Sequence, residues 1–339
     1  MINVGVVGLG MMGLTHIDVY SRRPDVRLLA ISDKMPDRLE GRVRATGNVE
    51  GQARGTVDYA SVRKYAEAMD LIRDPDIHVV DICLPTPLHA EYAIAALEAG
   101  KHTLIEKPVA RTLADARRIA DAAAAASRRG VRCMVAMCMR FWPGWTFLKQ
   151  AVDDGRFGKV LCAHFRRVAS HPGGPFYSDG AACGGALLDL HIHDTDFVQH
   201  CFGSPAEVHS VGYSRITSEI DHVITRYRYD NGPLVLAEGG WAMAAGFPFT
   251  MQYTVNFERA TAVYDLGANP PAVVYADGAR QPVALESGTG YDGEINYFLD
   301  CIAAQRDPQK VTMADAVNCI RILEAERHSV IMDRPVTLQ

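Results

Sequence analysis

The sequence predicts an α/β chain whose N-terminal part is a doubly wound parallel sheet and is followed by a second domain. Three observations favour this fold class. The chain has 339 residues, which is long for a single domain. A glycine-rich motif follows an apolar run at the N-terminus. Apolar runs then alternate with helix-like stretches of roughly a dozen residues, the pattern typical of βαβ units and a parallel sheet.

The first βαβ unit begins with the apolar run INVGVVG (2–8), which predicts a buried strand. A G-x-G-x-x-G motif follows, formed by Gly8, Gly10 and Gly13 around Met11 and Met12. In such a motif the first glycine makes the tight turn, the second lets a pyrophosphate approach the backbone, and the third lets helix and strand pack closely. The helix that follows offers free N–H groups and a positive dipole end to the phosphates. The motif therefore predicts a dinucleotide site.

The next strand, VRLLAIS (26–32), stops at Asp33, which lies 20 positions beyond Gly13. An acidic residue at this place binds the adenosine ribose in dinucleotide-binding folds. The alternative is a helix N-cap or turn residue. A carboxylate here repels a 2′-phosphate, so we predict NAD as the cofactor. NADP stays open, because a phosphate could be neutralised by Lys34, Arg38 or the arginines of the polar loop 41–55.

The alternation of strands and helices continues to residue 137. The sequence predicts strands at 78–84, 102–106 and 131–137, and helices at 88–99 and 113–129. We therefore assign residues 1–138 to a dinucleotide-binding domain and residues 139–339 to a second domain.

The composition argues against several kinds of partner. The formal net charge of −5 does not favour nucleic acid or an anionic membrane. No apolar run reaches the ~18 residues that a membrane span needs. The N-terminus lacks the basic region and cleavage site of a signal peptide. Eight scattered cysteines without a C-x-x-C pair indicate reduced thiols rather than disulfides or a zinc site. We therefore expect a cytoplasmic protein without nucleic-acid or membrane partners.

Three further motifs combine with the glycine motif. PTPLH (85–89) follows the strand that ends at Leu84, EKP (106–108) ends the next strand, and G-G-x-x-x-D-x-x-x-H spans 184–193. Together they resemble the glucose–fructose oxidoreductase / inositol dehydrogenase (Gfo/Idh/MocA) family over essentially the whole chain. The resemblance implies a Rossmann domain followed by an α+β domain with a large open, mostly antiparallel sheet, which binds substrate and forms oligomers. Strand-like runs such as VLCAHFRRV and HVITRYRY agree with this expectation.

The resemblance also implies an activity. It predicts an NAD(P)-dependent oxidoreductase that transfers hydride between nicotinamide and a secondary hydroxyl of a sugar, a cyclic polyol such as an inositol, or a derivative. Two alternatives stay open. One is a glycosidase or lyase that oxidises its substrate only transiently and keeps NAD bound. The other is a cofactor-binding sensor without catalysis. By analogy, we expect a homodimer or homotetramer.

The EKP motif lies at the carboxyl end of a predicted parallel strand, where ligands bind in such sheets. Pro108 disfavours the helical conformation for Lys107 and so favours an extended turn. An ordinary surface lysine is the alternative. The resemblance implies that Lys107 lies near the nicotinamide and the substrate hydroxyl. It implies cofactor contacts for Glu106 and for the preceding loop, namely Leu84, Pro85, Thr86 and His89; for His89 a structural role is the alternative.

The stretch GGALLDLHIHDTDF (184–197) contains an H-x-H pair that resembles a metal site. The run lacks period-2 alternation and is longer than a typical strand, so we predict a helix. In a helix His191 and His193 point about 200° apart and cannot bind one ion. By contrast, Asp189 and His193 are i and i+4 neighbours. We therefore predict no metal, and an acid/base histidine oriented by a carboxylate, as the family motif also implies. A surface Asp–His contact is the alternative.

Several weaker candidates complete the predicted site. Arg140 matches an inter-domain arginine that lies near cofactor and substrate in the family, with a salt bridge as the alternative. His171 lies in a Gly/Pro-rich loop that the family uses for substrate contact, and Tyr291 is a further substrate candidate. We interpret His191 as a bystander or an outer-pocket contact.

Overall fold

The computed structural model describes residues 1–41 and 59–338, which form two compact units. The first unit contains Met1–Met137 and Tyr291–Val317, and the second contains Cys138–Gly290 and Asn318–Gln339. The segment 291–317, which the sequence-based division placed in the second domain, therefore belongs to the first unit. Side-chain contacts fix it there: Arg23 donates to Asp300, and Arg132 donates to the carbonyl oxygen of Gln305. Among the described residues, no helix is both long enough and apolar enough to span a membrane.

The first unit is built on a six-stranded parallel sheet, which confirms the predicted doubly wound fold. Its strand order is β3-β2-β1-β4-β5-β6, so the order reverses between β1 and β4. Ligands bind at such a switch point in open α/β sheets. The strands are β1 (Ile2–Val7), β2 (Val26–Ser32), β3 (Arg63–Tyr65), β4 (Val79–Ile82), β5 (His102–Glu106) and β6 (Cys133–Ala136).

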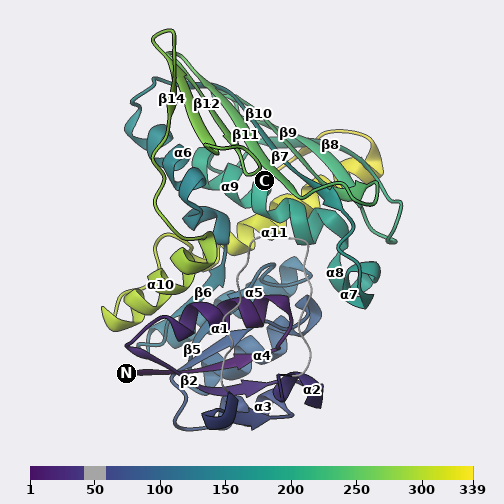
Figure 1. Cartoon of the computed structure of the whole chain (residues 1–339). Helices are drawn as coiled ribbons and strands as arrows, with labels where there is room; N and C mark the ends of the chain where they lie inside the picture. The colour runs from purple at the N-terminus through teal and green to yellow at the C-terminus, as the bar shows by residue number, and fades with distance from the viewer. Residues whose placement is uncertain (42–58, 339) are drawn as a thin grey trace. The chain divides into compact units, whose positions relative to one another are not determined.

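Helices flank this sheet, and Figure 1 labels most of them. They are α1 (Met11–Ser21), α2 (Pro36–Leu39), α3 (Ala68–Arg73), α4 (His89–Glu98), α5 (Leu113–Ser127) and α10 (Gly290–Ala303), with 3₁₀ turns η1 (Tyr59–Ser61) and η2 (Thr86–Leu88). Because helices cover both faces, the central strands read as continuous apolar runs. Val4, Val80 and Ile105 are fully buried.

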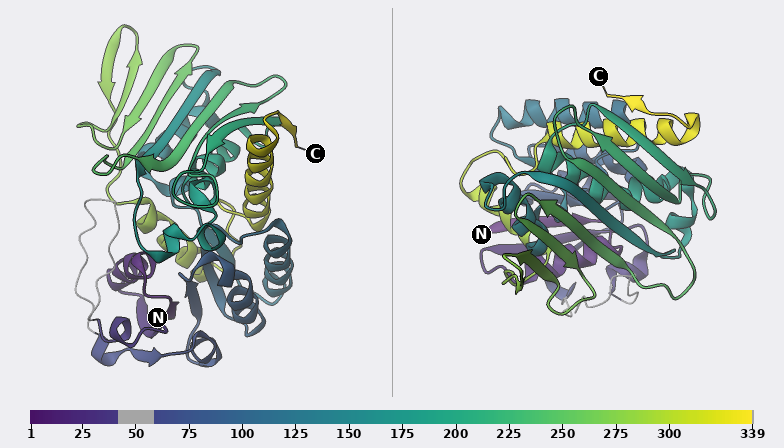
Figure 2. Two further views of the ribbon diagram at one scale, coloured as in Figure 1. Left: turned by 90° about the vertical axis from the view of Figure 1, so that its right-hand side faces the viewer. Right: turned by 90° about the horizontal axis from the view of Figure 1, so that it is seen from above.

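The second unit carries a nine-stranded sheet, in the order β14-β13-β12-β11-β7-β10-β9-β8-β15. All neighbours are antiparallel except β7 and β10, which confirms the expected mostly antiparallel sheet. Its strands lie side by side in the right-hand view of Figure 2. They are β7 (Val160–Ser170), β8 (Glu207–Tyr213), β9 (His222–Arg228), β10 (Leu234–Met243), β11 (Thr250–Phe257), β12 (Ala260–Asp265), β13 (Ala272–Ala276), β14 (Ala279–Pro282) and β15 (Val336–Thr337).

One face of this sheet is covered by helices. Trp145 is fully buried and contacts the rings of Phe165 on β7, Tyr253 on β11 and Phe197 on a covering helix. Such aromatic packing anchors helix to sheet. The helical elements of the unit are η3 (Cys138–Phe141), α6 (Pro143–Asp154), α7 (Pro175–Ser178), α8 (Gly180–Cys183), the π-helical turn η4 (Leu187–His191), α9 (Ile192–Phe202) and most of α11 (Met313–Met332).

Candidate functional site

The glycine motif forms the turn between β1 and α1. Gly8 has a φ of +92°, and a Cβ atom there would lie 2.5 Å from the carbonyl oxygen of Cys83. A Cβ atom at Gly13 would overlap the carbonyl oxygen of Gly8. Gly10 differs, because no atom lies within 4 Å of the place where its Cβ would be. Two glycines are therefore required by packing, and the third leaves open space at the N-terminus of α1, which starts at Met11 and Met12.

Asp33 lies at the end of β2 and ties the glycine turn to that strand. Its Oδ2 accepts a hydrogen bond from the Leu9 N–H at 2.8 Å, and its Oδ1 accepts one from the Met35 N–H at 2.8 Å. Arg38 donates to Oδ2 at 3.2 Å. The turn role that the sequence left open for Asp33 is therefore present. Because a carboxylate has about four lone-pair positions, this role is compatible with the predicted ribose contact. The arginines predicted in the 41–55 loop (Arg42, Arg44 and Arg54) lie outside the described residues.

The loop after β4 contains the predicted contacts Leu84, Pro85 and Thr86. His89 is buried at the start of α4, and its two ring nitrogens each lie 2.8 Å from a carbonyl oxygen, of Leu84 and of Pro108. The imidazole therefore joins the loops that follow β4 and β5. This is the structural role that the sequence left open for His89.

Lys107 directly follows β5 and is half-buried. The peptide bond between Lys107 and Pro108 is cis. Glu106 is largely buried, and its Oε2 accepts a hydrogen bond from the Lys107 N–H at 2.9 Å. The carboxylate of Glu106 thus fixes the backbone from which the lysine side chain extends.

The segment 187–202 is helical, as predicted, but its first turn is a π-helix over Leu187–His191, which the sequence did not indicate. Single π turns inside helices occur frequently at functional sites. Within 187–199 only Asp189, Leu190 and His193 keep partial exposure. Within 187–199 the two residues of the predicted acid/base pair are therefore the polar groups that keep partial exposure. His193 Nδ1 lies 3.9 Å from Cys138 Sγ.

The two histidines of the H-x-H pair have separate surroundings. His191 is fully buried, with Nε2 3.3 Å from Glu326 Oε2 and 3.2 Å from the Tyr227 hydroxyl. A side chain at Gly239 on β10 would overlap its ring. The outer-pocket contact considered for His191 is therefore wrong, because the ring is packed between the helix and the sheet.

Two buried ion pairs hold the same helix in place. Arg140 on η3 donates from Nε to Asp196 Oδ2 at 2.8 Å and from Nη2 to Asp196 Oδ1 at 2.7 Å. Arg167 on β7 donates from Nε to Asp194 Oδ2 at 2.9 Å. The salt bridge that the sequence left as the alternative for Arg140 is therefore present, and the side chain is only 2% exposed. The sequence analysis missed both pairings, although acidic residues beside the apolar positions of a buried helix indicate buried cationic partners.

The weaker substrate candidates lie in different units. His171, in the second, accepts at Nδ1 from the Gly173 N–H (3.1 Å) and donates from Nε2 to the Tyr177 carbonyl oxygen (3.2 Å). Both ring nitrogens are thus engaged within its own loop. Tyr291 is half-buried on α10, in the first unit.

Comparisons with known proteins match both units. The model of an oxidoreductase family with an NAD-binding Rossmann fold matches residues 2–137, and that of the GFO/IDH/MocA C-terminal domain matches residues 145–263. Myo-inositol 2-dehydrogenase of Thermotoga maritima is 30% identical over 252 residues, which cover 72% of this chain and 70% of the relative. The scyllo-inositol 2-dehydrogenase (NAD⁺) of Bacillus subtilis is 25% identical, covering 99% and 96%. Levoglucosan dehydrogenase in complex with NADH has a similar fold, with a TM-score of 0.85 and 23% identity over 100% and 99% of the two chains.

Substitution of the two motif glycines separates packing from ligand binding. We expect Gly13→Ala to lower the melting temperature and abolish NADH binding, because the methyl group overlaps the Gly8 carbonyl. Gly10→Ala should melt like the wild type, since its methyl group meets no atom, but should weaken NADH binding by roughly tenfold or more, about 1.4 kcal/mol. Thermal unfolding and fluorescence titration measure the two effects. Unchanged NADH affinity in Gly10→Ala would mean that the pyrophosphate does not approach here.

Proposed function

The chain belongs to the Gfo/Idh/MocA oxidoreductase family, and from this premise we propose that it transfers hydride between nicotinamide and a secondary hydroxyl of a sugar, a cyclic polyol or a derivative. It is an enzyme with an NAD-binding Rossmann domain. Relatives that are named inositol dehydrogenases and a structural neighbour that is named levoglucosan dehydrogenase support this substrate class. The observation that carries the proposal is the partial exposure of Asp189 and His193 in the segment 187–199, whose other polar side chains are buried.

The residues of the first unit fit a dinucleotide. The space at Gly10 and the N-terminus of α1 suit a pyrophosphate, and the Asp33 carboxylate suits ribose hydroxyls. A nicotinamide held by these residues would supply the hydride acceptor for oxidation of the substrate hydroxyl. We assign Lys107 to the neighbourhood of the reacting hydroxyl, where its ammonium stabilises the developing alkoxide.

In the second unit, we assign His193 as the group that takes the hydroxyl proton during oxidation and returns it during reduction. Asp189 orients the imidazole and stabilises its protonated form. Arg140 serves in this proposal as a positioning residue, because its ion pair with Asp196 joins η3 to the helix of His193. A panel of sugars and polyols with NAD tests the activity. Release of free NADH supports the proposal, whereas bond cleavage without free NADH would favour transient oxidation.

We propose NAD rather than NADP as the cofactor. The Asp33 carboxylate would repel a 2′-phosphate, and the nearby Arg38 is already paired with Asp33. NADH should therefore bind at least about tenfold more tightly than NADPH, and Asp33→Asn, which removes only the charge, should narrow the difference. Fluorescence titrations measure the dissociation constants of both cofactors. Arg38→Gln is the matched variant, which should weaken the binding of NADPH more than the binding of NADH. Equal or tighter binding of NADPH to the wild type would contradict the proposal.

Removing Lys107 or His193 should slow the chemical step. Both groups are proposed to act on charges that exist mainly in the transition state. Lys107→Ala and His193→Ala should each lose roughly 10²–10⁴-fold in kcat with little change in the dissociation constant of NADH. Asp189→Asn should lower kcat less than either of these changes, because the proposed base, His193, remains.

The matched control for these variants is His200→Ala, because His200 is also partly exposed on α9. It should keep a kcat close to that of the wild type. Steady-state kinetics on the substrate identified in the panel provide the comparison. A His193→Ala enzyme with nearly full kcat would remove the acid/base assignment.

We also propose that the chain forms a homodimer or homotetramer through the uncovered face of the nine-stranded sheet. Val211 on β8 and Ile224 on β9 are cross-strand partners and are both about half exposed (50% and 42%). Exposed apolar pairs on a sheet face favour association. Light scattering should give a mass of two or four chains, and Val211→Lys with Ile224→Lys should shift it toward one. A monomeric wild type would contradict this assembly.

A further inference from the structure

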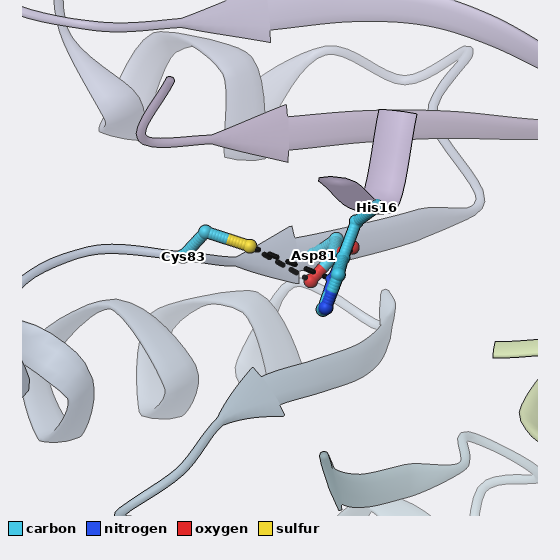
Figure 3. A group of neighbouring side chains, drawn as sticks. All are labelled: His16, Asp81 and Cys83. Carbon is cyan, nitrogen blue, oxygen red and sulfur yellow. Dashed lines mark hydrogen bonds and ion pairs between the residues drawn. The ribbon is translucent and has the colours of Figure 1, made fainter. Parts of the chain in front are cut away.

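The first unit contains a buried cluster of ionisable side chains that the proposed chemistry does not use. His16 on α1 and Asp81 on β4 are fully buried, and so is Glu294 on α10. Figure 3 shows the His16 imidazole and the Cys83 thiol both directed at the Asp81 carboxylate. His16 Nδ1 lies 2.8 Å from Asp81 Oδ2, and the Tyr20 hydroxyl donates to the same oxygen at 2.9 Å. Cys83 donates to Asp81 Oδ1 at 3.5 Å.

The other nitrogen of the imidazole faces two more carboxylates. His16 Nε2 lies 3.2 Å from Glu106 Oε1 and 3.9 Å from Glu294 Oε1, in both cases outside hydrogen-bond geometry. Neither carboxyl oxygen of Glu294 has a hydrogen-bond partner in the described part of the chain. His16 thus lies at ion-pair distance from all three carboxyl groups, those of Asp81, Glu106 and Glu294.

Three carboxyl groups this close together in the interior cannot all carry an uncompensated negative charge. If all three carboxyl groups were ionised, one imidazolium would leave two negative charges unpaired in an apolar interior, which is strongly unfavourable. The pKa shifts have matching directions. Burial works to lower the pKa of His16, but the Asp81 carboxylate, with Cys83, raises it well above its usual value. Burial, reinforced by Glu106, raises the pKa of Glu294 well above its usual value.

We propose that His16 is a permanently charged imidazolium that holds the Glu106 carboxylate in place, and that Glu294 closes the cluster as a neutral carboxylic acid. Glu106 connects this cluster to the proposed active site. Its Oε1 faces His16, while its Oε2 accepts the N–H of Lys107 at 2.9 Å. His16 and Glu294 are therefore positioning residues for the Lys107 turn. Only this last step, from Glu106 to Lys107, rests on the proposed function.

A divalent cation is the competing occupant. The ligand atoms of His16, Glu106 and Glu294 all lie within 4.8 Å of one another, a spacing that one ion could bridge. Such an ion would require a neutral imidazole and an ionised Glu294. It would also need an entry path, and both His16 and Glu294 are fully buried. Protons bound to His16 and Glu294 compensate the same negative charges and need no entry path for a metal ion.

Nitrogen-15 NMR of the full-length protein labelled at histidine tests the charge of His16, whose signals are assigned by their loss in His16→Gln. We expect both ring nitrogens to remain protonated well above pH 7, whereas a free imidazole titrates near 6.5. A neutral His16 at pH 7 overturns the proposal. So does one equivalent of a divalent metal in the purified protein whose removal shifts the His16 signals.

The pH dependence of stability tests Glu294. Both groups bind a proton more tightly in the folded chain than in the unfolded chain, whose pKa values are near 6.5 for His and 4.3 for Glu. Their stabilising effect is therefore complete below the unfolded values and is lost as pH rises toward the folded values. Glu294→Gln keeps the size and the neutral charge of the acid but removes the group that titrates. The melting temperature of this variant should therefore decline less steeply between about pH 5 and 9 than that of the wild type. Glu91→Gln, at an exposed position on α4, is the control and should keep the wild-type slope. An unchanged slope in Glu294→Gln overturns the neutral-acid assignment.

Kinetics test the positioning role. His16→Gln should lower kcat by roughly tenfold or more, and Glu294→Gln should keep more of kcat than Glu294→Ala, because the amide preserves a neutral polar group of the same size. A folded His16→Gln protein with wild-type kcat overturns the positioning role. Failure of the proposed function is distinguishable, because Lys107→Ala would then keep full kcat while the His16 signals remain those of an imidazolium.

Discussion

Helix α1 approaches the parallel sheet so closely at Gly13 that any side chain there would overlap the Gly8 carbonyl oxygen. The same buried helix face carries His16 and Tyr20, three and seven positions further on. The close approach lets both side chains reach Asp81 on β4. The glycine that a dinucleotide motif requires for packing therefore also brings a histidine into the interior, beside β4.

Both units bury charged side chains in apolar surroundings, and these charges are compensated differently in the two units. In the second unit, Arg140 and Arg167 meet Asp196 and Asp194 as buried ion pairs with satisfied hydrogen bonds. Breaking such a pair leaves an uncompensated buried charge and is strongly destabilising. These pairs therefore secure a helix that presents few accessible polar groups. In the first unit, the carboxyl groups of the cluster at His16 face an imidazole, and in our proposal bound protons compensate their charge.

The proposed catalytic groups depend on these supports. Lys107 extends from a backbone segment that Glu106 holds, and Glu106 in turn faces His16. His193 follows a π turn in a helix fixed by two ion pairs. A reacting group needs precise placement, because transition-state interactions weaken quickly when a side chain shifts. The buried charges thus connect folding to the proposed chemistry in each unit.

Local patterns in the sequence determined the parallel sheet, the glycine turn, the end of β5 at Glu106 and the helix over 187–202, because each depends on residues close together in the chain. Nothing local indicated the π turn, the burial of His191 against Glu326, or the partner of Arg140. No local pattern indicated that residues 291–317 belong to the first unit. These features were decided by the tertiary structure, since the partner of a buried charge is whichever group the folded chain brings within about 3 Å, however distant in sequence.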